Sequence, residues 1–146
     1  MKAHVVAVAR LVETVWPFDI YYGDVGAYDV FEQRVPSITY PYVLLWSSAG
    51  RLLSDEVCGT PDDLNDLIGV TTVAADAMGC LTAVGKVREA LIGKAPAVAG
   101  RHTQRLRLFA SEQIRPDESV RLPDTNTYPV YAVDQYRLIS EPEEGP

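Results

Sequence analysis

The residues with the most capacity for chemistry in this 146-residue chain are two histidines and two cysteines. His4 stands near the start of the chain, and His102 lies in a basic stretch. Cys58 falls in a predicted strand and Cys80 on the apolar stripe of a predicted helix, where cysteine is usually a small buried hydrophobe. A Cys–His nucleophile pair would need the fold to bring these residues together, and no local motif favours one. We therefore interpret the histidines as polar surface and predict that the protein is not an enzyme.

A second candidate is an acidic cluster between residues 55 and 66, whose carboxylates could bind a divalent cation. Its members are Asp55, Glu56, Asp62, Asp63 and Asp66. The alternating ligand spacing of a calcium-binding loop is missing, and so are the phosphate-binding loop, the dinucleotide fingerprint and the nucleophile elbow. We interpret the cluster as solvated turn residues and predict neither a metal nor a cofactor.

The most informative charged feature is a basic segment between two acidic ones. Residues 86–107 contain six basic residues and one acidic residue, Glu89; the basic ones are Lys86, Arg88, Lys94, Arg101, Arg105 and Arg107. Such charges can protect an edge strand from aggregation. They can also pair with the acidic surface of a second copy, and a head-to-tail contact of that kind closes into a ring when the rotation permits. Charge alone leaves both readings open.

The tyrosines favour assembly, since tyrosine is enriched at protein interfaces, although strands also favour this residue. They are Tyr21, Tyr22, Tyr28, Tyr40, Tyr42, Tyr128, Tyr131 and Tyr136.

The length and the 47% hydrophobic content indicate one folded domain, which we place at residues 1–140 with a flexible acidic tail at 141–146. The net charge of −7 disfavours simple nucleic-acid binding. No apolar run approaches the roughly 20 residues of a membrane span, and a reducing cytosol is the expected compartment.

Apolar periodicity predicts two helices. The first runs up to Pro17, with apolar residues at helical spacing from Val5 to Trp16. The second follows Asp76, whose carboxylate can cap the first turn, and ends near Gly93. Gly79 and Gly85 in the second helix would let it lie close on a sheet.

Strands are predicted at Tyr42–Ser47, Leu52–Cys58, Leu67–Ala75, Gln104–Ala110 and Pro129–Ile139, with a further short strand before the loop that leads to Thr39. The order is one helix, four strands, one helix and two strands. It favours an α+β fold in which both helices pack on one face of a mainly antiparallel sheet. A long loop, 111–128, joins the last two strands; loops of this length are often functional or disordered.

This order of elements, together with several short strings, resembles the tail terminator (tail-completion) proteins of long-tailed phages of actinobacteria. The strings are Tyr22-Gly23-Asp24-Val25 before Pro36, Pro41-Tyr42-Val43-Leu44-Leu45, Gly69-Val70-Thr71-Thr72-Val73, Lys86-Val87-Arg88-Glu89-Ala90-Leu91-Ile92-Gly93, Gly100-Arg101 and Tyr131-Ala132-Val133-Asp134-Gln135-Tyr136-Arg137-Leu138. The resemblance covers most of the chain.

The resemblance implies an α+β subunit of a hexameric ring in the tail neck of the virion, assembled in the host cytoplasm. The ring caps the head-proximal end of the tail tube, stops its polymerisation and joins the head-completion proteins, with DNA passing through the lumen and no chemical step. An acidic lumen would repel DNA. The expected partners are further copies of the chain, the tail tube protein and the head-completion (stopper) protein.

On this interpretation Arg101, Arg105, Arg107 and Tyr131 contribute to the subunit interface, and Asp24, Tyr28, Glu118 and Asp124 contact the tube or neck. One alternative is the stopper itself, which would form a ring on the portal side. The other is a small enzyme or ligand-binding domain, in which Cys58, His102 and the acidic residues 62–66 would converge in one pocket.

Overall fold

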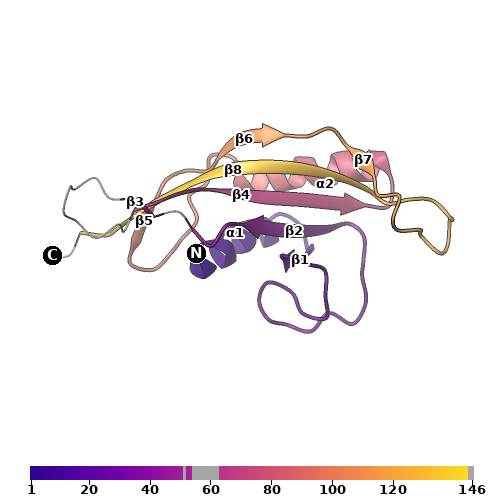
Figure 1. Ribbon diagram of the computed structural model, residues 1–146, viewed down its shortest axis with the longest axis horizontal. Helices are drawn as coiled ribbons and strands as arrows, with labels where there is room; N and C mark the ends of the chain where they lie inside the picture. Colours follow the sequence, from indigo (N-terminus) through magenta and orange to yellow (C-terminus); the bar gives the residue numbers. More distant parts are fainter. Residues whose placement is uncertain (51, 54–62, 145–146) are drawn as a thin grey trace.

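The computed structural model describes residues 1–50, 52–53 and 63–144 (Figure 1). Its helices are α1 (Lys2–Glu13) and α2 (Ala77–Leu91). Its strands are β1 (Asp19–Tyr22), β2 (Tyr42–Ser47), β3 (Leu52–Leu53), β4 (Asp63–Ala74), β5 (Arg101–Thr103), β6 (Arg107–Ser111), β7 (Arg115–Pro116) and β8 (Val130–Pro142). Within the described residues no helix is long and apolar enough to cross a membrane.

The strands form one sheet around two long central members, β4 and β8, which pair antiparallel from Leu64↔Ser140 to Ala74↔Val130 (Figure 1). The order across the sheet is β1-β2-β4-β8, and β5, β6 and β7 pair with the outer side of β8. Among the strands that the structure describes, β1 and β2 pair parallel and the other neighbours pair antiparallel. The sheet therefore has β1 at one edge, and β5, β6 and β7 together form the other.

One face of this sheet forms the main core, and both helices cover it. Alternate strand residues point into it: Ile20, Val43, Leu45, Ile68, Val70, Tyr136 and Leu138. Val8 and Val12 of α1 and Val87 and Leu91 of α2 pack against them. Fully burying a side chain of this size stabilises the fold by about 1.5–3 kcal/mol. The predicted α+β fold, with two helices on one face of a mainly antiparallel sheet, is confirmed.

The second helix begins as predicted. The Asp76 carboxylate accepts a hydrogen bond from the Gly79 amide at 2.7 Å, which satisfies one of the free donors of the first turn. The proposed role of the helix glycines is wrong. A Cβ at Gly85 would meet nothing within 4 Å, and one at Gly79 would meet only the capping Asp76 side chain.

The predicted strand at 104–110 is divided. Residues 101–103 pair with the end of β8, residues 104–106 leave the sheet, and β6 resumes at Arg107 with an irregular register between Leu108 and Ala110. Leu106 is fully buried in the link. Strand β8 continues to Pro142, so it extends into the segment expected as a tail. The predicted hairpin strand 52–58 lies largely outside the described residues.

On the sheet face away from the helices, Gly69 of β4 lies under the indole of Trp46 of β2, its register partner. A Cβ at position 69 would stand 2.0 Å from Cε2 of Trp46. The indole nitrogen donates a hydrogen bond to Oγ1 of Thr71 at 3.1 Å. The flat ring can occupy this position because residue 69 has no side chain.

We expect Gly69→Ala to lower the free energy of unfolding by about 2 kcal/mol, because the indole must move off the strand. Urea unfolding followed by circular dichroism measures the change. The matched control is Gly85→Ala, in an exposed helix position, which should stabilise the protein by roughly 0.5–1 kcal/mol. An unchanged midpoint for Gly69→Ala would contradict the packing described.

Candidate subunit interface

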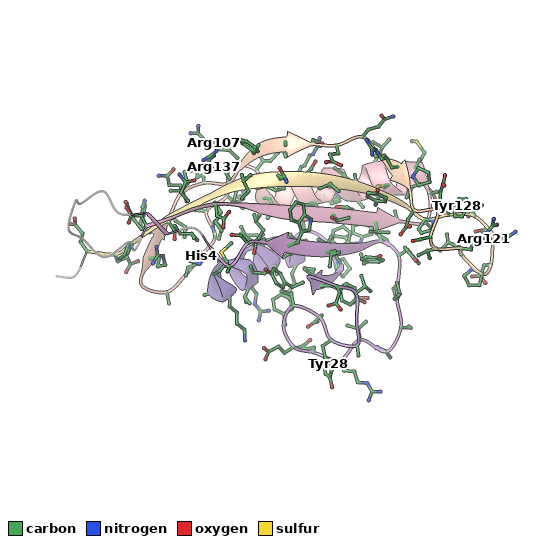
Figure 2. All side chains as sticks on the ribbon, viewed as in Figure 1. His4, Tyr28, Arg107, Arg121, Tyr128 and Arg137 are labelled. Carbon is green, nitrogen blue, oxygen red and sulfur yellow. The ribbon has the colours of Figure 1, made fainter. Side chains whose placement is uncertain are left out.

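The edge strand β6 and its neighbour β8 bring Arg107, Arg137 and the exposed Phe109 together, and Arg105 is exposed in the link just before β6. We call these four residues the basic edge. Arg107 and Arg137 are register partners on β6 and β8, so two like charges stand side by side (Figure 2). The guanidinium of Arg137 lies over the Phe109 ring at 5.3 Å and donates to Oδ1 of Asn65 at 3.0 Å. Phe109 is 55% exposed, although it is a large aromatic residue. This edge therefore combines positive charge with an uncovered apolar ring.

Three other residues of the basic segment, Lys86, Arg88 and Arg101, make contacts inside the subunit. Lys86 pairs with Glu89 at 3.7 Å, and Arg88 pairs with Asp134. Arg101 donates from Nε to Oγ of Ser140 at 2.8 Å and from Nη2 to the Ser140 carbonyl at 3.0 Å. Of the predicted interface arginines, the structure therefore brings Arg105 and Arg107 to one exposed edge and holds Arg101 against the end of β8.

The ion pair between Arg88 of α2 and Asp134 of β8 joins the helix to the core face of the sheet. Its two hydrogen bonds measure 2.8 and 2.9 Å, and Arg88 also donates to Oγ of Ser111 at 2.8 Å. Burial alone would raise the pKa of Asp134, but the hydrogen bonds and charge of Arg88, with the hydrogen bonds of Ser111 and Tyr136, outweigh it and lower that pKa. The Asp134 side chain is only 4% exposed. Arg88 therefore neutralises a charge that would otherwise be buried alone.

The sequence analysis missed this pair, although it contained the signal. Asp134 occupies the same alternating face of β8 as Ala132, Tyr136 and Leu138. A carboxylate at an inward position requires a cation or several donors nearby. Arg88 could have been named from that requirement, because it lies one helical turn after the buried Val84 on α2.

The interpretation of His4 as polar surface is wrong. Its side chain lies on the buried face of α1, one and two turns from Val8 and Val12, and is 5% exposed. Nε2 is 2.7 Å from Oγ of Ser140, which already accepts from Arg101. Among the described residues Nδ1 has no hydrogen-bond partner. The serine oxygen can donate one hydrogen bond and accept two, so the tautomer of His4 sets the direction of this contact. His102 is exposed on β5, as predicted.

Burial, the α-amino group and Arg101 lower the pKa of His4. The unfolded chain therefore takes up this proton first, so stability falls as the pH drops below about 6.5 towards the folded pKa. We expect a loss of up to about 1.4 kcal/mol per pH unit in that window. His4→Gln should flatten the dependence of unfolding free energy on pH between 7 and 5, while His102→Gln should leave it as in the wild type. Equal slopes for the three proteins would contradict the assignment.

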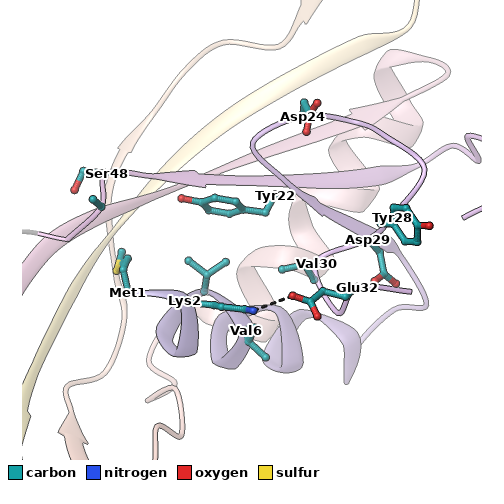
Figure 3. A pocket seen from close by; sticks show the side chains of 12 residues that line it. Met1, Lys2, Val6, Tyr22, Asp24, Tyr28, Asp29, Val30, Glu32 and Ser48 are labelled. Atoms are coloured by element: carbon teal, nitrogen blue, oxygen red, sulfur yellow. Dashed lines mark hydrogen bonds and ion pairs between the residues drawn. The ribbon is translucent and has the colours of Figure 1, made fainter. Parts of the chain in front are cut away.

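At the opposite edge of the sheet, a pocket of about 360 Å³ opens between the start of α1, the end of β1 and the loop after it (Figure 3). We call it the acidic pocket. Its apolar wall includes Val5, Val6, Val30, Tyr22 and Tyr28, and its carboxylates are Asp24, Asp29 and Glu32. Lys2 bonds Glu32 at 2.8 Å, and both are largely exposed. Asp29 also accepts two amides of its own loop, those of Phe31 and Gln33. Two predicted contact residues, Asp24 and Tyr28, therefore meet in one site.

The other two predicted contact residues, Glu118 and Asp124, are exposed on a different loop, 117–128, at the far end of the sheet (Figures 1 and 2). Arg121 organises this loop by donating to Oδ1 of Asn126 and to the hydroxyl of Tyr128, whose ring it also covers at 4.9 Å. The long loop 111–128 therefore has internal structure, including β7. The four residues proposed to contact the tube or neck divide between two loops.

The tyrosines are partly buried in the core and partly exposed on the surface. Tyr21 and Tyr136 are fully buried, whereas Tyr28 is 65% exposed. Tyr131 is half-buried on β8, where it pairs with Val73 of β4 and Arg115 of β7. The tyrosine content therefore serves the core as well as the surface.

The residues of the acidic cluster and of the enzyme alternative fall into two groups, those inside and those outside the described part of the chain. Cys58, Asp55, Glu56 and Asp62 lie outside the described residues. Asp66 bonds to the hydroxyl of Ser48, and Asp63 opens β4. Cys80 is buried against the carbonyl of Thr72, and burial raises the pKa of its thiol. In the described part of the chain no group of three or more His, Cys, Asp or Glu residues could hold a metal ion.

Comparison with known proteins finds a similar fold among solved structures. No protein-family model matches the chain, and no curated protein sequence matches it. Among solved structures, a chain in the virion of a native gene transfer agent particle aligns with a TM-score of 0.51 at 15% identity. The fold is shared with a virion chain. The alignment covers 95% of this chain and 94% of that one, so the likeness spans the full length of both.

Proposed function

We propose that this protein is a structural virion protein, the tail terminator of a phage or phage-like particle. Copies form a ring of six at the head-proximal end of the tail tube, stop tube polymerisation and bind the head-completion protein. DNA passes through the lumen without specific binding, and no chemical step is involved. The observation that carries the virion role is the fold shared over its full length with a chain of a gene transfer agent virion.

The ring rests on a second observation, the opposite charge of the two sheet edges. The basic edge lies on β6 and the acidic pocket beside β1, at opposite ends of the strand order. Copies that meet basic edge to acidic pocket use two different surfaces, which is the condition for a closed ring rather than a two-fold dimer. The overall charge of −7 leaves acidic surface elsewhere to repel DNA in a channel.

The function is tested in the producing particle by deleting the gene and measuring tail tubes by electron microscopy. We expect tubes of uncontrolled length without heads, and normal particles when the wild-type gene is supplied in trans. Tubes of normal length attached to heads would contradict the proposal. Tubes of normal length without heads would favour the stopper function instead.

A further inference from the structure

The exposed ring of Phe109 is the most unusual feature of the basic edge. Phe109 follows Leu108, which packs against the core, and it lies at the register irregularity of β6 without a partner residue on β8. Phe109 and Arg137 meet on the sheet face opposite the helices, because Arg137 alternates with the core residues Tyr136 and Leu138. An exposed aromatic flanked by arginines has the composition of an interface hot spot.

The acidic pocket has the complementary properties. Its interior is apolar, and its three carboxylates outnumber the ammonium group of Lys2 and the α-amino group of Met1, so the lining is net negative. Figure 3 shows Tyr28, Asp29 and Glu32 together at one end of the pocket, with Tyr22 and Val6 along its length. An aromatic ring that enters the pocket would therefore contact its apolar walls, while guanidinium groups beside the ring would face the carboxylates at the rim.

The positions of the two surfaces determine how copies could meet. The basic edge is on the outer face at one side of the sheet, and the pocket is on the helix side at the other. One copy can therefore lie partly over the next, with its β6 edge against the start of α1 in its neighbour. The same contact repeats from copy to copy and leaves no unused surface in a closed ring.

We propose that the acidic pocket of each subunit receives Phe109 of a second copy of this chain, with Arg105, Arg107 and Arg137 against the carboxylates of Asp24, Asp29 and Glu32. The inference rests on the proposed ring and names the contact that closes it. Phe109 supplies the buried anchor, and the arginines set the direction of approach.

Photo-crosslinking from position 109 tests the contact directly. Phe109 is replaced by p-benzoylphenylalanine in the full chain, and ¹⁵N-labelled and unlabelled copies are mixed, irradiated and digested. We expect crosslinked peptides of mixed isotope that join position 109 to residues 1–6, 22–32 or 48–49. The matched control carries the same probe at Met78, which is 73% exposed on α2 and should give no such product. Intermolecular crosslinks elsewhere, or none up to millimolar concentration, would overturn the proposal.

Two variants test the contact without a probe. Phe109→Glu removes the ring, and Val6→Lys places a cation in the pocket; each should weaken self-association by about thirty-fold or more. Mixed together, they retain one intact edge and one intact pocket, so native mass spectrometry should show a heterodimer that grows no further. Phe109→Leu should retain most of the association. Failure of the mixed variants to form a heterodimer would overturn the contact. So would a small ligand that fills the pocket and leaves the crosslinking from position 109 unchanged.

The outcomes separate this inference from the proposed function. A closed ring on tail tubes without crosslinks to the pocket would refute the Phe109 contact and leave the terminator role intact. Crosslinks to the pocket in a protein absent from tail tubes would support the contact and refute the role.

Discussion

Replacing Asp134 with alanine is expected to lower the free energy of unfolding by about 3 kcal/mol, among the largest losses available from one side chain outside the apolar core. The variant leaves Arg88 of α2 without its bidentate partner and opens the packing between α2 and β8. The Arg88 side chain is 37% exposed and can turn towards water, so the loss falls at the low end of the range for a broken buried pair. Urea unfolding at pH 7 measures it.

The control is Glu89→Ala, which removes the exposed partner of Lys86 one turn along the same helix and should cost less than about 0.5 kcal/mol. The double variant Arg88→Met with Asp134→Leu should recover most of the loss, because an apolar pair leaves no charge unpaired. The pair also lowers the pKa of Asp134, so its stabilisation is complete above about pH 4 and disappears as the pH falls through the folded pKa. A loss no larger than that of Glu89→Ala would contradict the structural role of the pair.

Reversing the charge of the basic edge is expected to leave folding intact and to raise the dissociation constant of self-association by about tenfold or more. Arg105 and Arg107 are exposed, so Arg105→Glu with Arg107→Glu should change unfolding free energy by no more than about 0.5 kcal/mol each. The new carboxylates would face those of the acidic pocket in the next copy. Native mass spectrometry and sedimentation velocity measure the shift from rings to monomers, and the defect should shrink at 0.5 M salt.

Two matched variants make this prediction specific. Arg115→Glu reverses an exposed charge on β7, which pairs with a different part of β8 from β6. This variant should assemble as the wild type does. Adding Asp24→Lys and Glu32→Lys to the reversed edge restores opposite signs across the contact and should recover assembly. An unchanged oligomer in the Arg105→Glu, Arg107→Glu protein would refute the role of the basic edge.

The sequence predicted the elements that carry their own apolar period. The helical spacing from Val5 onward, the cap at Asp76 and the alternation of β2 and β8 are local properties, and the structure confirms them. The segment 104–110 alternates as well, yet residues 104–106 leave the sheet because Leu106 is buried in the link beside the end of α2, where its amide bonds the carbonyl of Lys94. That contact joins segments that are distant in the chain, so the local pattern of apolar residues could not predict it.

The candidate site was predictable only in part, for a related reason. Residue type identified Arg105 and Arg107 as an exposed basic pair, but their separation from Arg101 depends on Ser140, which is remote in sequence. The meeting of Asp24 and Tyr28 with α1 depends on the loop after β1 packing back across the chain. Phe109 alternates with Leu106 and Leu108, so the sequence pattern already places it on the outward side; its contact with Arg137 depends on the pairing of β6 with β8.

The most direct test of the account is the position of the protein on the tail. A gold-labelled copy of the full chain is supplied to particles that lack the gene, and labels are located by electron microscopy on intact tails. The account predicts one ring-shaped cluster at the head-proximal end of each tube, with the tube length restored. Labels along the tube, at its distal tip or on the portal side of the neck would contradict it.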